Sequence, residues 1–94
     1  MTNKQYSDFV KRYWMGGGLL HSTLGLCGEA GELAEVVKKG VFYPTNPDID
    51  TTQCLKELGD VLFYVVATAN ELGFDLNYVM GLNKAKLEDR YGVK

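Results

Sequence analysis

Two pairs of acidic residues recur at the same spacing in this sequence. Glu29 and Glu32 are three residues apart, and so are Glu57 and Asp60. On an α-helix, residues three apart share a face, so each pair would place two like charges side by side. Like charges at that separation repel each other unless a cation lies between them. The spacing therefore indicates chemistry in which carboxylates hold a positive charge.

Four carboxylates around one cavity would be untenable without positive charge, and a hard divalent cation would supply it. Such cations prefer oxygen ligands, and Mg²⁺ typically takes one or two carboxylates together with water and substrate phosphates. We therefore expect a metal site between the two acidic pairs. Di-iron four-helix proteins also place carboxylates on facing helices, but they use Glu-x-x-His on two of them. The single histidine, His21, is in no such motif, which argues against that alternative.

The three glutamates of this part of the sequence would point in different directions on a helix. At about 100° per residue, Glu29 falls beside the apolar side of its helix, Glu32 at the border and Glu35 on the opposite side. Lys38 and Lys39 follow Glu35 at three and four residues, so an ordinary solvated ion pair also explains Glu35. The apolar side is formed by Leu26, Ala30, Leu33 and Val37.

Four helical segments are expected to position these acids, and no alternating strand pattern competes with them. The segments run over about residues 3–14, 19–39, 51–73 and 76–90. Thr2 and Asp75 are the candidate N-caps of the first and last segments. Gly40 and Gly73 are the candidate stop signals after the middle two. The sequence thus predicts an all-α fold in a single domain spanning residues 1–94.

The third segment is apolar around nearly its whole circumference. Between residues 58 and 69 only Gly59, Asp60 and Thr68 interrupt the apolar run. A helix that is hydrophobic on all sides must be buried on all sides. Three other short helices can hardly cover it, so we expect a second copy of the chain to pack on the remaining face. In the second segment, glycines at 25, 28 and 31 would let another helix or a substrate approach closely.

The composition argues against a nucleic-acid-binding, secreted or membrane-spanning protein. The formal net charge is −2, so no basic excess indicates a nucleic-acid partner. The N-terminal residues lack the apolar run of a signal peptide, and no stretch reaches the roughly 18 apolar residues of a membrane span. The two cysteines form no metal or disulfide framework. We expect a cytoplasmic protein that binds neither membrane nor nucleic acid.

The stretches GEAGELAEVVKK and ELGDVLFYVV resemble the MazG-type all-α nucleoside triphosphate pyrophosphohydrolases. The signature of that superfamily is Glu-Glu-x-x-Glu, roughly two dozen residues, and then Glu-x-x-Asp. Here 24 residues separate Glu32 from Glu57, and Gly28 replaces the first glutamate, as in the short single-domain members. The similarity extends over residues 24–91.

The resemblance implies a magnesium-dependent enzyme, with Mn²⁺ as a possible substitute. It would cleave a nucleoside triphosphate into a monophosphate and pyrophosphate, in nucleotide-pool or house-cleaning metabolism. Glu29, Glu32, Glu57 and Asp60 would be the metal ligands, and Glu29, Glu32 or Glu35 would activate the attacking water. It also implies a four-helix-bundle type of MazG-like fold completed by homo-oligomerisation, with a tetramer (a dimer of dimers) favoured over a dimer.

Substrate contacts are expected from the last helix and from the acidic side of the third. Asn83, Lys86 and Arg90 fall on the same side as the apolar residues of the last helix, where they would meet phosphate oxygens. Tyr64 lies on the acidic side of its helix. Further candidates for stacking on a base are Tyr13, Trp14, His21, Phe42 and Tyr43.

Two other interpretations stay open. One is a related enzyme that hydrolyses phosphoribosyl-ATP. The other is a non-catalytic helical oligomer that binds a nucleotide or a protein, although such a module would gain nothing from stacked like charges.

Overall fold

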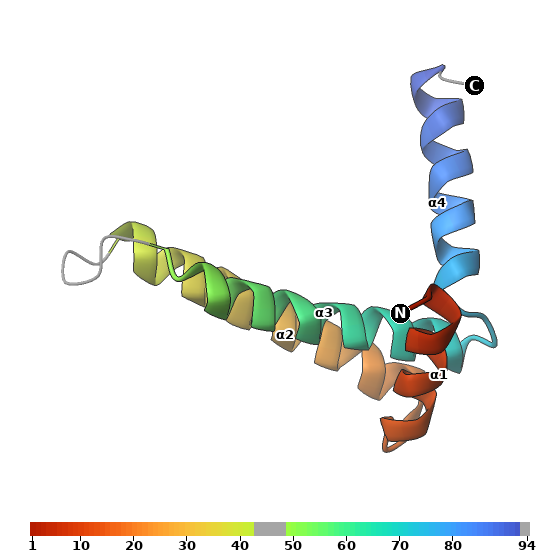
Figure 1. Cartoon of the computed structure of the whole chain (residues 1–94), viewed down its shortest axis with the longest axis horizontal. Coiled ribbons are helices and arrows are strands. Elements are labelled where there is room, and N and C mark those ends of the chain that lie inside the picture. The colour runs from red at the N-terminus through yellow and green to blue at the C-terminus, as the bar shows by residue number, and fades with distance from the viewer. Residues whose placement is uncertain (43–48, 93–94) are drawn as a thin grey trace.

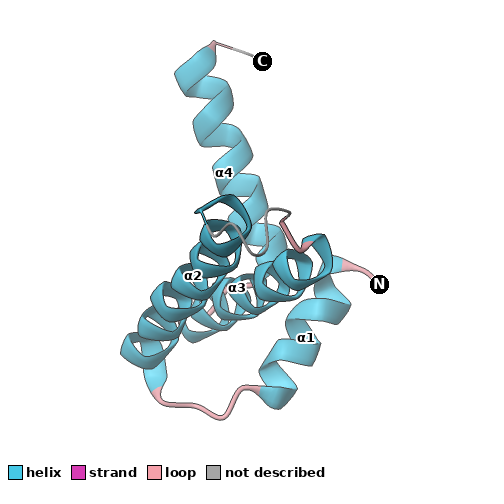
Figure 2. Ribbon diagram, turned by 90° about the vertical axis from the view of Figure 1, so that its left-hand side faces the viewer, coloured by secondary structure: helices cyan, strands magenta, loops and turns pink. Residues whose placement is uncertain are grey.

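The computed structural model describes residues 1–42 and 49–92. Over these residues the chain forms the helices α1 (Asn3–Tyr13), α2 (Gly18–Phe42), α3 (Thr51–Glu71) and α4 (Leu76–Tyr91), and no strand. The expected all-α class is confirmed. Helices α2 and α3 form a long hairpin, α1 packs across one end of it, and α4 stands out from that same end (Figures 1 and 2).

Local capping sets three of the helix starts. The Thr2 hydroxyl accepts the Gln5 backbone N–H at 3.0 Å, and the Gln5 side chain accepts the Thr2 N–H at 2.7 Å, which completes a capping box. Asp50 and Asp75 each accept a backbone N–H from the first turn of α3 and of α4. The expected starts of α1, α3 and α4 are confirmed.

The predicted end of α2 at Gly40 is wrong, because the helix continues to Phe42. Gly40 is buried, and a Cβ added there would lie 2.7 Å from the Cα of Ile49. This glycine therefore permits a close approach of the returning chain and does not stop the helix. Gly73 does end α3 as expected, because its φ of +88° is a left-handed conformation that glycine adopts without strain.

The buried core is small and lies where α1, α3 and the start of α4 meet. A hydrogen bond from the Asn70 side chain to the Ser7 carbonyl, at 3.2 Å, ties α3 to α1. The Ser7 hydroxyl in turn accepts the Leu76 backbone N–H at 3.2 Å, which ties α1 to α4. Among the described residues, the buried hydrophobic side chains are Val10, Val66, Ala67 and Ala69.

One face of α3 remains uncovered in a single chain. Leu55, Leu58 and Leu62 are 62%, 50% and 40% exposed. The chain exposes 6912 Å² in total, whereas a compact monomer of its mass exposes about 5,400 Å². Its radius of gyration is 15.9 Å, against about 12.4 Å for a compact domain of this length. Even so, no helix of the described residues is long and apolar enough to cross a membrane.

Candidate functional site

The structure brings together three of the four expected metal ligands. Glu29 from α2 and Glu57 and Asp60 from α3 each offer a carboxylate oxygen, and these three oxygens lie within 4.8 Å of one another. Glu29 and Glu57 are half-buried between the helices, whereas Asp60 is exposed. The helical phase of Glu29, beside the apolar side of α2, is what directs it toward α3.

The carboxylate of Glu57 is held by a neighbour on its own helix. The Gln53 side-chain amide donates to Glu57 Oε1 at 2.8 Å. Because Gln53 is four residues earlier, the two side chains lie on the same face of α3. Gln53 is therefore a positioning residue that orients one oxygen of the three-acid group, formed by Glu29, Glu57 and Asp60.

The three-acid group carries uncompensated negative charge. Burial raises the pKa of Glu29, and the charges of Asp60, Glu57 and Glu32 raise it further. Over the described residues the only ion pairs are two exposed i,i+4 pairs elsewhere on α1 and α4. Clustered carboxylate oxygens without a protein cation are the donor set that suits a hard divalent ion. The residues present thus fit a Mg²⁺ or Mn²⁺ site.

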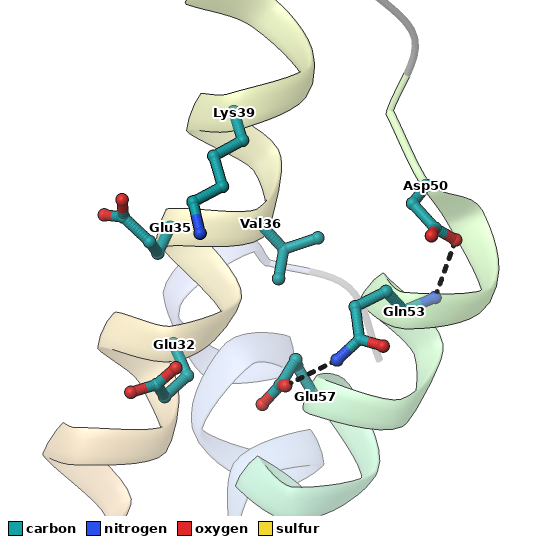
Figure 3. Close-up of a pocket in the computed structure, with 7 residues that line it drawn as sticks. All are labelled: Glu32, Glu35, Val36, Lys39, Asp50, Gln53 and Glu57. Atoms are coloured by element: carbon teal, nitrogen blue, oxygen red, sulfur yellow. Dashed lines mark hydrogen bonds between the residues drawn. The ribbon is translucent and has the colours of Figure 1, made fainter. Parts of the chain in front are cut away.

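Glu32 and Glu35 face a second part of the acidic side. They line a hollow of about 340 Å³ that also reaches Glu57 (Figure 3). Glu35 forms no ion pair with Lys38 or Lys39, so the solvated ion pair that would also explain this acid is not observed. The hollow is lined by Glu32, Glu35, Val36, Lys39, Asp50, Gln53 and Glu57.

Tyr64 lies beside the three-acid group, in a hollow of about 320 Å³ lined by Glu29, Asp60, Phe63 and Tyr64. Its ring rests on Gly25 of α2, where any Cβ would collide with it. The glycine at 25 therefore serves a close approach, as expected. Glycines 28 and 31 face open space in the single chain, so the same explanation does not extend to them.

The expected phosphate contacts do not meet the acids within one chain. Asn83, Lys86 and Arg90 are exposed on α4, which has no buried residue. A helical wheel identifies which residues share a face, but not what that face meets. In the described residues, the hydrogen bonds between α1 and α4 are made in the first turns of α4, by Leu76, Asn77 and Met80. The assignment of these side chains to the substrate stays a prediction.

The aromatic candidates form a group around Trp14. Its indole N–H donates to Glu71 Oε1 at 2.6 Å, and its ring lies 5.2 Å from that of His21 and 5.8 Å from that of Tyr64. Tyr13 is 56% exposed, and its ring lies 4.9 Å from that of Phe9 on the same helix. The Phe42 side chain and Tyr43 lie outside the described residues.

Three residues at the site were not predicted from the sequence. The signal for Gln53 was present, since it precedes Glu57 by four residues. The apolar neighbours of Phe63 in the sequence favour a core position for it, yet it lines the hollow beside Asp60. Tyr6 comes from α1, and both burial and the charge of Asp60 raise the pKa of its hydroxyl. No local pattern predicts that α1 reaches the acids.

Comparisons with known proteins agree with this geometry. The family model of the MazG nucleotide pyrophosphohydrolase domain matches residues 19–92. The Gene 37 protein of Mycobacterium phage L5 is 43% identical to this chain over 79 residues. The match covers 78% of this chain and 66% of that protein, which is just under two thirds of its length. No solved structure matches the chain. The family model spans more than half of the sequence, including all three members of the three-acid group. The chain therefore belongs to the MazG nucleotide pyrophosphohydrolase family.

Proposed function

We propose that this chain hydrolyses nucleoside triphosphates to nucleoside monophosphates and pyrophosphate with the help of a divalent ion, Mg²⁺ or in its place Mn²⁺. One P–O bond of the α–β phosphate anhydride breaks, and the oxygen of a water molecule takes its place. The observation that carries the proposal is the convergence of Glu29, Glu57 and Asp60 on one point of the helix hairpin, without a protein cation to balance them.

Each acid has a role in this proposal. Glu29, Glu57 and Asp60 would hold the metal, with Glu32 as the fourth expected ligand at the edge of the adjoining hollow. When bound, the ion would make water a better nucleophile and offset the charge of the phosphates. Glu35 or Glu32 would accept the proton of the attacking water, because both line the hollow next to the metal ligands.

The substrate would lie along the acidic side of the hairpin. Tyr64 faces the hollow beside Asp60, so its ring or hydroxyl can contact the nucleoside. Lys86, Arg90 and Asn83 would contact the phosphates. A bound metal ion reverses the local sign of the acidic pocket, which lets a protein of net charge −2 bind a polyanion.

We further propose that the active form is a homo-oligomer in the cytoplasm, a dimer that pairs again into a tetramer. The uncovered leucines of α3 support self-association. The proposed activity fits removal of surplus or non-standard nucleotides.

The direct test is pyrophosphate release from a panel of canonical and modified triphosphates, with and without Mg²⁺. Glu29→Gln, Glu57→Gln and Asp60→Asn should each abolish turnover while circular dichroism stays native. Asp8→Asn is a matched control, because this exposed acid pairs with Lys4 on α1. Full activity in any two of the three site variants would refute the metal assignment.

The same panel separates the remaining alternatives. Hydrolysis of phosphoribosyl-ATP in preference to every nucleoside triphosphate would place the chain with that related activity. Binding of triphosphate without pyrophosphate release, under conditions where Mg²⁺ stabilises the protein, would indicate a binding module.

A further inference from the structure

One side of α1 carries a row of aromatic rings. Tyr6, Phe9 and Tyr13 recur at spacings of three and four, so they share one side of the helix. The ring centroids of Tyr6 and Phe9 are 5.9 Å apart, and those of Phe9 and Tyr13 are 4.9 Å apart. Phe9 and Tyr13 are exposed, whereas Tyr6 is half-buried. Tyr6 is therefore the member of this row that is most enclosed by the rest of the fold.

Tyr6 lies where α1 crosses α3, close to the hollow of the three-acid group. Its ring packs against the buried core at this crossing, and so does the ring of Phe63. Phe63 in turn lines the hollow of about 320 Å³ that contains Asp60. At about 100° per residue, Asp60 lies within about 20° of the core residue Ala67 around the axis of α3. Asp60 therefore continues, two turns earlier, the stripe of α3 that packs under α1.

The charge of Asp60 acts on the Tyr6 hydroxyl. Burial raises the pKa of Tyr6, and the Asp60 carboxylate raises it further. A charge has this effect only at short range, because water and salt screen charges that are more than roughly 8–10 Å apart. At neutral pH a tyrosine hydroxyl is protonated. It can therefore donate a hydrogen bond toward the acids.

Asp60 is the member of the three-acid group that its neighbours support least. Gln53 donates to Glu57 Oε1 at 2.8 Å, and Glu29 is half-buried between the helices. Asp60 is exposed, and within the described residues neither its carboxylate nor the Tyr6 hydroxyl takes part in a hydrogen bond. Carboxylates that bind metal ions are usually held by hydrogen bonds from neighbouring groups. A donor for Asp60 is thus the missing part of the site, and Tyr6 is placed to supply it.

We propose that Tyr6 is a positioning residue of the metal site, whose hydroxyl donates toward Asp60 through a bridging water and fixes the direction in which this carboxylate meets the ion. Polar groups that lie near each other without direct contact are commonly joined in this way. The inference rests on the metal assignment of the proposed function, and it is independent of which triphosphate is cleaved.

The chemical nature of the donor matters at this position. A lysine or arginine would form an ion pair with Asp60 and compete with the metal for the carboxylate. The phenol is neutral, so it orients the carboxylate and leaves the negative charge available to the ion. Gln53 is likewise a neutral donor to Glu57. Each of the two acids on α3 is thus matched with a neutral donor, one from α3 itself and one from α1.

Metal affinity is the first test. Mg²⁺ binding is measured by calorimetry, and Mn²⁺ binding by the loss of the free-ion EPR signal, on wild type and on Tyr6→Phe, which keeps the ring and removes the hydroxyl. Tyr6→Phe should weaken binding by about 10-fold, the lower end of the range for a group that orients a metal ligand. Equal affinities of the two proteins would overturn the proposal.

Tyr78→Phe is the matched control, because it also removes one hydroxyl from a half-exposed ring. The ring of Tyr78 stacks on that of Phe74 at 4.4 Å, beside a hollow that contains none of the three acids. Its metal affinity should equal that of wild type. An equal loss of affinity in Tyr78→Phe and Tyr6→Phe would overturn the proposal, since the loss would then not depend on proximity to Asp60.

A double-mutant cycle in EDTA tests the same contact without a metal. Thermal midpoints are compared for wild type, Tyr6→Phe, Asp60→Ala and the double variant, at one concentration of chains. Tyr6→Phe should lower Tm by about 2–8 °C in the wild-type background and by much less in the Asp60→Ala background. A hydroxyl that only stabilises the packing of α1 would lower Tm equally in both backgrounds, and that result would overturn the proposal.

The outcomes separate this inference from the proposed function. Absence of metal binding in wild type would refute the metal assignment, and with it the role of Tyr6. Metal binding without pyrophosphate release in wild type would count against the hydrolase activity alone. Metal binding and pyrophosphate release in wild type, with the same metal affinity in Tyr6→Phe, would overturn this inference alone.

Discussion

The three-acid group should make the metal-free protein less stable than it would be with one carboxylate fewer. The three carboxylate oxygens lie within 4.8 Å of one another, and two unit charges at that limit repel by about 0.9 kcal/mol in water and about 3.5 kcal/mol at an effective dielectric constant of 20. Asp60 is exposed, so the lower figure is the appropriate one, and solvent screening reduces it to roughly 0.5–0.9 kcal/mol for each pair. Asp60 faces two partners, and Asp60→Asn should therefore stabilise the metal-free chain by about 1–2 kcal/mol.

The assay is thermal unfolding followed by circular dichroism, first in EDTA and then in Mg²⁺, at a fixed concentration of chains because self-association changes the midpoint. For a domain of this size, 1 kcal/mol shifts Tm by about 4–8 °C. In EDTA, Asp60→Asn should thus unfold roughly 4–16 °C above wild type. Mg²⁺ should raise Tm of the wild type and leave that of the variant nearly unchanged.

Glu35→Gln is the control, since it removes the same charge from the adjoining hollow but lies outside the three-acid group. Its Tm in EDTA should change by much less than that of Asp60→Asn. Equal shifts in the two variants would mean that overall charge, and not the proximity of three carboxylates, sets the stability. A lower Tm for Asp60→Asn in EDTA would refute the reasoning.

Further outcomes are expected at four other positions. Gly25→Ala should displace the Tyr64 ring and raise KM for triphosphate, which steady-state kinetics would measure. Gly28 faces open space, so Gly28→Ala should stabilise α2 by about 0.5–1 kcal/mol, which thermal unfolding would measure. Because the pKa of Glu29 is raised, this carboxylate binds a proton more tightly in the folded than in the unfolded chain. The stability of the metal-free protein should therefore fall as pH rises above 4.5 through that raised pKa. Glu29→Gln should remove this pH dependence. Mg²⁺ affinity, measured by calorimetry, should correspondingly weaken as pH is lowered through the same range. Val66→Ala should cost about 2 kcal/mol, because Val66 is fully buried within its own chain, and denaturant titration would detect it.

The burial of Val66 distinguishes it from its neighbour Val65, which the apolar run of the third helix alone does not. Val66 packs into the core with Val10 of α1, whereas Val65 borders a hollow lined by residues of α3. A charge at Val66 would unfold the chain before it affected any interface.

The sequence predicted best what depends on neighbours along the chain. Helix starts at Thr2 and Asp75 follow from side chains that cap the next turn, and they were predicted correctly. The proximity of the two acidic motifs followed from helical phase. It was predicted for four residues, and three of them lie together in the structure. These features need no knowledge of how helices cross.

The prediction was less successful where distant segments meet. The glycine at position 40 resembles a stop signal, but contact with Ile49 gives it another role. The face of α4 that carries Lys86 was predicted as inward, yet Lys86 is exposed in the described part of the chain. In both cases the spacing of residues along one helix does not encode which other segment that helix meets.

The aromatic group around Trp14 has a practical consequence. Trp14 is the only tryptophan of the chain, and its ring lies edge-on to Tyr64, 5.8 Å away, which in turn lines the hollow beside Glu29. Its indole N–H is fixed by Glu71, so the fluorophore has a defined orientation. The tryptophan emission of this protein, excited at wavelengths that tyrosine does not absorb, therefore comes from one native residue located one side chain away from the proposed nucleotide. It offers a way to follow binding at the proposed site in real time, without a label and without turnover.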